Sequence, residues 1–134
     1  MRKDSRISRV LHILIHMGAN NGSMTSVHIA QMLSTNPVVV RRIMGGLRDV
    51  GYVQTIKGRG GGWMLACPLK NITLLDIYNI FSETSLFAIG LTDEHSDCFI
   101  EKNINEELGA IMNEATELML GRFSEITLDL LNKR

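Results

Sequence analysis

Residues 36–48 read NPVVVRRIMGGLR, a stretch that combines a helix start, an apolar face and a pair of cations. Asn36 can accept hydrogen bonds from the free amides of a first helical turn, and Pro37 suits the first helical position, where its missing N–H costs nothing. A core face recurs at helical spacing, at Val40, Ile43, Met44 and Leu47. The pattern predicts a helix to about residue 50, and Gly51 is a natural stop.

Two glycines interrupt this predicted helix, at positions 45 and 46. A glycine in a helix interior costs about 1 kcal/mol relative to alanine. We expect Gly45 and Gly46 to allow close packing against one of the two preceding helices.

Two helices are predicted before this stretch. Residues 5–17 repeat apolar side chains at helical spacing, at Ile7, Val10, Leu11, Leu14 and Met17. After a loop at 18–23, Thr25 or Ser26 caps a short helix to about residue 33 that should bury Val27, Ile29, Ala30 and Leu33. Residues 34–37 then form a turn, so the second and third helices make a helix-turn-helix.

The segment after residue 50 predicts a β-hairpin and a fourth helix. Residues 52–56 and 63–66 favour strands, and the glycine-rich residues 57–62 form the turn between them. Thr73 and Asp76 have the spacing of a capping box for a helix that ends near residue 82. Residues 82–103 show no clean period, so we expect a loop there.

A long helix is predicted from residue 103 to about 131. Its apolar positions, here named the apolar seam, alternate steps of four and three before a one-residue slip, and they are Ile104, Leu108, Ile111, Ala115, Leu118, then Met119, Phe123, Ile126 and Leu130. A seam this long and narrow cannot be covered by a small domain alone. It predicts pairing with a second copy of the chain.

The charge of the chain is sharply divided although its formal total is zero. Residues 1–70 hold ten Lys and Arg against two acids, a net charge of +8. Residues 71–134 hold four Lys and Arg against twelve acids, a net charge of −8. The division indicates a basic half for a polyanion and an acidic half with another role.

The predicted fold class is therefore mainly α with a small β-hairpin wing, a winged helix-turn-helix followed by a long dimerisation helix. Such an arrangement favours double-stranded DNA as the partner, because the start of the third helix can meet base edges and a basic wing can meet phosphates or the minor groove. The predicted DNA-binding residues are Thr25, Ser26, Pro37, Val38, Val39, Arg41, Arg42, Lys57, Arg59 and Gly60. The predicted dimer interface is Leu108, Ile111, Ala115, Leu118, Met119, Phe123 and Ile126.

Other function classes lack their sequence signals. The glycine-rich turn leads into a strand rather than a helix, unlike a nucleotide-binding loop. His12 and His16 share one helix face without the glutamate of a metalloprotease motif, and no catalytic pair is evident, so we predict neither an enzyme nor a metal site. No apolar run reaches the roughly 18 residues of a membrane span, and the charged N-terminal segment lacks a signal-peptide cleavage site, which predicts a cytoplasmic protein.

Several of these segments together resemble the Rrf2 family of bacterial winged-helix transcription regulators. They are NPVVVRRI at residues 36–43, KGRGGGW at 57–63 and ITLLDI at 72–77. The resemblance implies a homodimer that binds a palindromic operator, usually as a repressor, with the third helix in the major groove and the wing in the minor groove. Many members ligate an iron–sulfur cluster through three cysteines after the fourth helix. This chain has only Cys98 there, so it resembles the cluster-free branch and we predict no cofactor.

The signal and the alternatives stay open at the level of sequence. Cys98 is a candidate redox thiol, although its acidic neighbours disfavour reactivity. A small-molecule or protein effector could instead enter a pocket lined by Tyr78, Phe81, Phe87 and Phe99. We divide the chain into a DNA-binding domain at 1–82 and a sensor-like loop with the dimerisation helix at 83–134. The alternative function is a protein-interaction module that uses the winged-helix fold without specific DNA binding.

Overall fold

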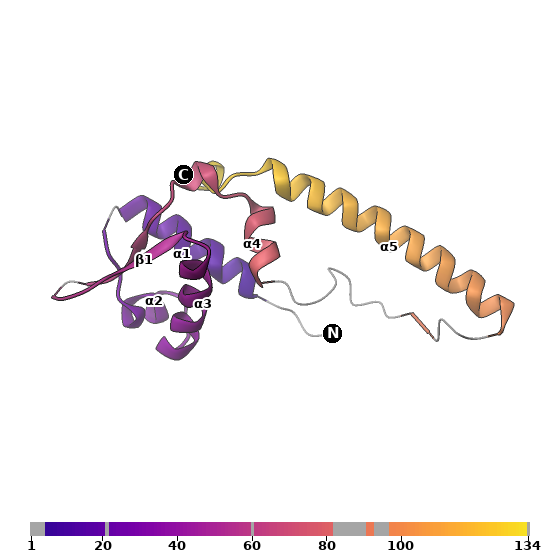
Figure 1. Cartoon of the computed structure of the whole chain (residues 1–134), viewed down its shortest axis with the longest axis horizontal. Helices are drawn as coiled ribbons and strands as arrows, with labels where there is room; N and C mark the ends of the chain where they lie inside the picture. Colours follow the sequence, from indigo (N-terminus) through magenta and orange to yellow (C-terminus); the bar gives the residue numbers. More distant parts are fainter. Residues whose placement is uncertain (1–4, 21, 60, 82–90, 93–96, 134) are drawn as a thin grey trace.

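The computed structural model describes residues 5–20, 22–59, 61–81, 91–92 and 97–133, which form a body and one projecting helix (Figure 1). The body comprises the described residues between 5 and 81 together with residues 128–131, and α5 runs away from it. The elements in chain order are α1 (Arg6–Asn20), α2 (Ser26–Met32), α3 (Pro37–Asp49), β1 (Val53–Ile56), β2 (Gly62–Leu65), the 3-10 turn η1 (Leu69–Asn71), α4 (Leu74–Phe81), α5 (Phe99–Glu125) and the 3-10 turn η2 (Leu128–Leu131). The predicted fold class is confirmed.

An aliphatic core holds α1, α2 and α3 together. The predicted core face of α3 is confirmed, since all four of its residues are buried. Opposite it lie buried residues of α1 and α2, namely Val10, Ile13, Leu14, Met17, Ile29 and Ala30. One prediction was wrong: Val27 is 53% exposed rather than buried. It follows α2's first residue, on the side of that short helix away from the core.

Both helix starts in the helix-turn-helix are capped as the sequence predicts. The Thr25 hydroxyl accepts a hydrogen bond from the His28 amide at 3.1 Å. The Asn36 carboxamide oxygen accepts from the amides of Val38 and Val39 at 3.0 and 3.1 Å. Such caps contribute about 1 kcal/mol each, so they fix where α2 and α3 begin and therefore which residues point outward.

The hairpin is joined to the helix-turn-helix through a third backbone segment. Strands β1 and β2 pair antiparallel, with Thr55 opposite Trp63. Trp63 also exchanges two backbone hydrogen bonds with Met24, both at 2.8 Å. Gly62 has φ +147°, and a Cβ there would lie 2.5 Å from the Met24 carbonyl oxygen. The glycine is needed for this close approach, which fixes the hairpin against the start of α2.

The two glycines of α3 have different surroundings. At Gly46 a Cβ would lie 3.4 Å from the ring of Phe81 in α4, so the expected close packing exists but involves α4 rather than α1 or α2. At Gly45 no heavy atom of the described residues lies within 4 Å of a Cβ position. The packing expectation was therefore wrong for Gly45.

Helix α5 begins four residues earlier than predicted, at Phe99, and ends six residues earlier, at Glu125. The early end has a tertiary cause. The Leu74 amide donates to the Ile126 carbonyl at 3.0 Å, and the Leu128 amide donates to the Ile72 carbonyl at 2.9 Å. These bonds end the helix at this point and hold η2 against the body, where Leu128 is fully buried. Ile126 is thus not part of the helical seam.

The one-residue slip in the apolar seam marks a change of neighbour. After the slip, Phe123 packs edge-on against Tyr78 of α4 at 6.0 Å between ring centroids, and Met119 is half-buried. Before the slip, Ile104, Ile111 and Leu118 are 51–69% exposed, and no residue of α5 is fully buried in the described chain. The last turns of α5 therefore pack on their own body. In its first half Asn105 bonds to Thr92, but the apolar side chains Ile104, Ile111 and Leu118 stay exposed among the described residues.

Candidate nucleic-acid interface

The outward face of α3 carries the cations predicted to meet DNA. Val38, Arg41 and Arg42 recur at helical spacing and are all exposed. Their common face lies opposite the core face, which points into the body. Val39 differs, because it is half-buried and packs against the core. The structure thus makes Val38 and the two arginines available to a ligand, and Val39 a supporting residue.

The first residues of α2 face solvent and also bind the wing. Thr25 is exposed, and its hydroxyl already caps the helix. The Trp63 indole N–H donates to the Ser26 hydroxyl oxygen at 3.0 Å. Ser26 therefore links α2 to β2, a role that sequence reasoning missed, and its hydroxyl proton stays available for a phosphate oxygen.

The wing projects from the body as a narrow ribbon, shown at the left of Figure 1. Lys57 and Arg59, on its turn, are both exposed. Gly58 has φ +98°, a conformation that side chains rarely adopt, so glycine is required for this turn. Gly60, also predicted to bind DNA, lies outside the described residues.

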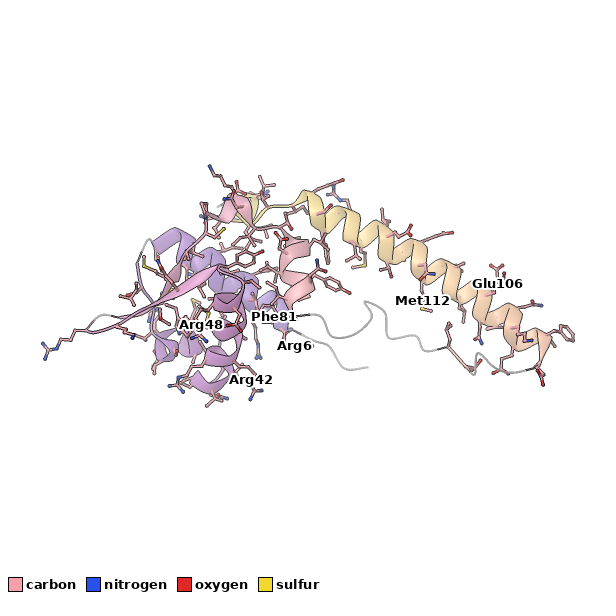
Figure 2. The ribbon with its side chains drawn as sticks, viewed as in Figure 1. Arg6, Arg42, Arg48, Phe81, Glu106 and Met112 are labelled. Carbon is pink, nitrogen blue, oxygen red and sulfur yellow. The ribbon has the colours of Figure 1, made fainter. Side chains whose placement is uncertain are left out.

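The cations of this surface have few partners within the protein. Arg41, Arg42, Lys57 and Arg59 form no ion pair within the described ranges. Arg48, near the end of α3, lies 3.9 Å from Asp49 and places its guanidinium 6.0 Å from the Trp63 ring centroid. Figure 2 shows Arg42 and Arg48 on the lower part of the body, whereas α5 leaves from its upper side. Exposed and uncompensated positive charge is what phosphate binding requires.

The Trp63 indole is a testable part of this surface. We expect Trp63→Phe to lower the free energy of unfolding by about 1 kcal/mol, since the Ser26 hydrogen bond is lost while most apolar burial is retained. DNA affinity should fall a few-fold because the wing is held less firmly. Ser26→Ala removes the same bond from the other side. Urea denaturation of both variants and of the double variant should show that the two losses do not add, and additive losses would contradict the link.

Burial raises the pKa of Tyr52 above its ordinary value, and the nearby Asp76 and Cys67 raise it further. The phenol therefore stays neutral through the physiological pH range. The backbone amide of Tyr52 donates to the Leu47 carbonyl at 3.0 Å, which holds the residue against the end of α3.

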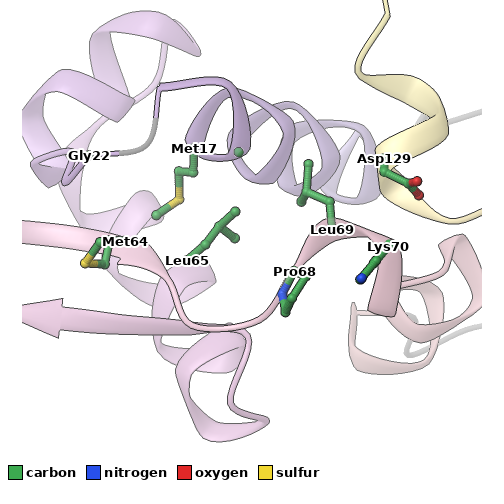
Figure 3. A pocket seen from close by; sticks show the side chains of 9 residues that line it. Met17, Gly22, Met64, Leu65, Pro68, Leu69, Lys70 and Asp129 are labelled. Atoms are coloured by element: carbon green, nitrogen blue, oxygen red, sulfur yellow. The ribbon is translucent and has the colours of Figure 1, made fainter.

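A cavity of about 470 Å³ lies behind the hairpin, between the end of α1, β2, η1 and η2 (Figure 3). Met17, Met64 and Leu69 line it, and Lys70 and Asp129 bring opposite charges to one end. The aromatic residues predicted to line an effector pocket are elsewhere: Tyr78 and Phe81 pack in the body, and Phe99 is 71% exposed. Phe87 lies outside the described residues.

Comparisons with known proteins identify relatives of the whole chain. A sequence model of the Rrf2 family, described as an iron-dependent transcriptional regulator, matches residues 4–134. Protein aau3 of Rhizobium meliloti (strain 1021) is 24% identical over 124 residues, covering 90% of this chain and 80% of that protein. A candidate transcriptional regulator from Lactobacillus plantarum is 26% identical, with a TM-score of 0.76 over 93% of this chain and 85% of that one. CymR of B. subtilis, the global cysteine regulator, is 22% identical, with a TM-score of 0.67 over 98% of this chain and 96% of that one, which shows a shared fold.

The residues of this chain do not fit an iron centre of the kind that the family description suggests. Cluster ligation uses several thiolates, and the chain has two cysteines. Cys67 follows β2 in the body, whereas Cys98 precedes the end of α5 that lies farthest from the body (Figure 1). Among the described residues, no three His, Cys, Asp or Glu side chains form a group that could hold a metal ion. Nor is any helix in these ranges long and apolar enough to span a bilayer.

Proposed function

Because the chain belongs to the Rrf2 family of DNA-binding transcriptional regulators, we propose that it acts as a repressor that binds a palindromic operator as a homodimer. Its family and structural neighbours are regulators and not enzymes. In this proposal α3 enters the major groove, and the wing reaches the adjacent backbone or minor groove. The protein would act in the bacterial cytoplasm, where its operator is accessible.

The outward face of α3 carries this proposal. Arg41 and Arg42 are exposed, have no ion-pair partner in the described chain, and lie in the first half of the helix, the part that meets base edges in helix-turn-helix proteins. Lys57 and Arg59 extend the same charge onto the wing. The proposed DNA-binding residues therefore remain Thr25, Ser26, Pro37, Val38, Arg41, Arg42, Lys57, Arg59 and Gly60, with Val39 supporting the helix from its inner side.

The exposed half of α5 supports the homodimer. Ile104, Leu108, Ile111 and Leu118 present 37–69% of their surface along one edge of a helix that projects from the body (Figure 1). A row of apolar side chains at this spacing is typical of helix pairing, and a second copy supplies the complementary row. A two-fold dimer matches a two-fold operator.

The proposed dimer interface is therefore narrower than the full seam. Leu108, Ile111, Ala115 and Leu118 precede the slip, in the part of α5 whose apolar side chains are largely exposed among the described residues. Met119 and Phe123 belong to the part that packs against α4 of the same chain, and Ile126 leaves the helix. We propose that these last three residues set the angle of α5 to the body rather than contact the second subunit.

A binding titration at several salt concentrations tests the proposed function. The probe is a duplex enriched by the wild-type protein from a randomised DNA pool. Affinity should fall steeply with salt. The slope of log K against the logarithm of the salt concentration should be about −0.9 for each phosphate that the protein neutralises. If the protein enriches no sequence and binds no duplex at low salt, the operator proposal is wrong and the protein-interaction module becomes the better reading.

The wing makes its own contribution to this titration. We expect Arg59→Ala to weaken binding roughly tenfold and to lower the salt slope, because a phosphate or minor-groove contact is lost from each half-site. Lys133→Ala removes one positive charge near the C-terminus and should change neither quantity. Sedimentation should show that both variants remain dimers. Unchanged affinity of the Arg59 variant would overturn the assignment of the wing.

The entry point of a regulatory signal is a separate proposal. The division of the chain into a DNA-binding domain at 1–82 and a C-terminal part at 83–134 places the regulatory signal in the C-terminal part. Leu128 of that part nevertheless belongs to the core of the body. Cys98 is exposed at the far end of α5, where a redox change or an effector would act on the second subunit rather than on α3. A small-molecule or protein effector therefore remains a proposed partner together with DNA.

A further inference from the structure

Gly45 lies in the middle of the outward face of α3. It follows Val38 by seven residues, Arg41 by four and Arg42 by three, which is the spacing of one helix stripe. The three other members of the stripe are exposed. Gly45 is half-exposed, with the side chains proposed to contact DNA one or two turns before it and Arg48 and Asp49 one turn after it.

Neither packing nor backbone conformation explains a glycine at this position. No heavy atom of the described chain lies within 4 Å of a Cβ built on Gly45, whereas Gly46 beside it faces the Phe81 ring at 3.4 Å. Gly45 is also absent from the glycines with positive φ, which are Gly51, Gly58 and Gly62. Its backbone is helical, so an alanine would fit and would favour the helix more. The chain retains an unfavourable residue at a position where no contact among the described residues favours glycine.

The dimensions of a helix in a DNA groove give the glycine a role. The major groove is about 12 Å wide, and an α-helix with its side chains is about 10–12 Å across. The fit leaves almost no spare room, so a missing side chain at mid-helix lets the helix axis lie closer to the groove floor. Long side chains one turn earlier, such as Arg41 and Arg42, then reach base edges.

From this placement we propose that Gly45 is the close-approach position of the recognition helix, where base edges of the operator come nearer to the α3 backbone than a Cβ allows. The inference rests on the proposed function and adds a specificity-determining residue to it. Gly45 determines depth of insertion, whereas Arg41, Arg42 and Val38 supply the contacts. A close approach at the groove floor contributes more to the affinity for the operator than to the affinity for non-specific DNA. In a non-specific complex the helix is not inserted fully into the groove.

The proposal predicts opposite changes in stability and binding. Gly45→Ala should raise the melting temperature by a few degrees, since alanine favours the helix and restricts the unfolded chain. The same variant should bind the enriched duplex about tenfold more weakly, the size of one weakened base contact. Gly45→Leu should lose at least about a hundredfold. Binding to an unrelated duplex should change little, so the ratio of specific to non-specific affinity should fall.

Gly121→Ala is the matched control. Gly121 is an exposed helical glycine in α5, and no heavy atom of the described residues lies within 4 Å of its Cβ position. Its alanine variant should also gain stability but should keep wild-type affinity for the enriched duplex. The two variants together separate a general effect of helix stiffening from an effect at the DNA surface.

The outcomes distinguish this inference from the proposed function. If the wild type binds the enriched duplex and Gly45→Ala binds it equally well, the close-approach role is overturned while DNA binding stands. If Gly45→Ala changes the sedimentation of the protein, Gly45 faces a second subunit instead, which also overturns it. If the wild type enriches no duplex at all, the failure belongs to the proposed function.

Discussion

A Leu118→Glu variant should sediment as a monomer and bind the enriched operator about 10²–10⁴-fold more weakly than the wild type. Leu118 is 69% exposed on α5 in the described structure, although leucine is an apolar residue that prefers burial. In a two-fold dimer the substitution places two carboxylates in one apolar interface. Burying unpaired charge costs several kcal/mol, roughly enough to separate the subunits at micromolar concentration.

The loss of affinity follows from the loss of linkage between half-sites. A dimer binds its second half-site at a high effective concentration, and a monomer does not, which is the source of the expected range. The monomer should still bind non-specific DNA at low salt, because the arginines of α3 and the cations of the wing are untouched. This residual binding separates a broken dimer from an unfolded protein.

Asn113→Glu is the matched control for this variant. Asn113 is exposed on α5 but is not part of the apolar seam, so the substitution adds the same charge outside the predicted contact. Sedimentation should find this variant dimeric and titration should find it active. A Leu118→Glu protein that stays dimeric would contradict the assignment of the seam, whatever its DNA affinity.

Local sequence signals predicted the part of the fold that forms through local interactions. The cap at Asn36, the capping box of Thr73 and Asp76, and the core face of α3 were all readable, because each depends on residues within one or two turns. The fold class followed from their order. The same signals placed Arg41 and Arg42 on the outward face of α3.

Tertiary contacts determined what the sequence could not predict. The end of α5 depends on hydrogen bonds to Ile72 and Leu74, far away in the chain, and no local stop signal marks residue 125. The seam contained a hint in its one-residue slip, but only the structure shows that the slip separates an exposed half from a half packed on α4. Likewise, the spacing of Gly45 and Gly46 is uninformative until Phe81 is found beside one of them.

The division of charge also becomes more specific in the structure. Five cations of the basic half lie on α3 and the wing, and all of these but Arg48 lack an ion pair within the described residues. Six of the twelve acids of the acidic half lie on α5, which leaves the body on the side away from the wing (Figure 1). This separation disfavours DNA binding along α5, because its carboxylates repel phosphates within the roughly 10 Å reach of charge in dilute salt.

The residues after α5 connect these two halves, which gives Leu128 an importance that its position near the C-terminus does not suggest. Its side chain is fully buried with residues of α1 and η1, and its amide donates to the Ile72 carbonyl. Thr127 forms the matching bridge to Thr73, the cap of α4. The segment therefore fastens the dimerisation helix to the DNA-binding body of the same chain.

We expect Leu128→Ala to lower the free energy of unfolding by about 2–5 kcal/mol, the usual cost of deleting a buried leucine side chain and leaving a cavity. Leu130 lies two residues later and is 54% exposed, so Leu130→Ala should change the free energy of unfolding by less than about 0.5 kcal/mol. Urea denaturation followed by circular dichroism measures both. Similar losses in the two variants would show that burial at Leu128 does not fasten the segment. If only Leu128→Ala is destabilised, its operator affinity should then be measured under conditions in which the variant is still folded. A loss of operator affinity in an intact dimer would mean that the angle between α5 and the body sets the spacing of the two recognition helices.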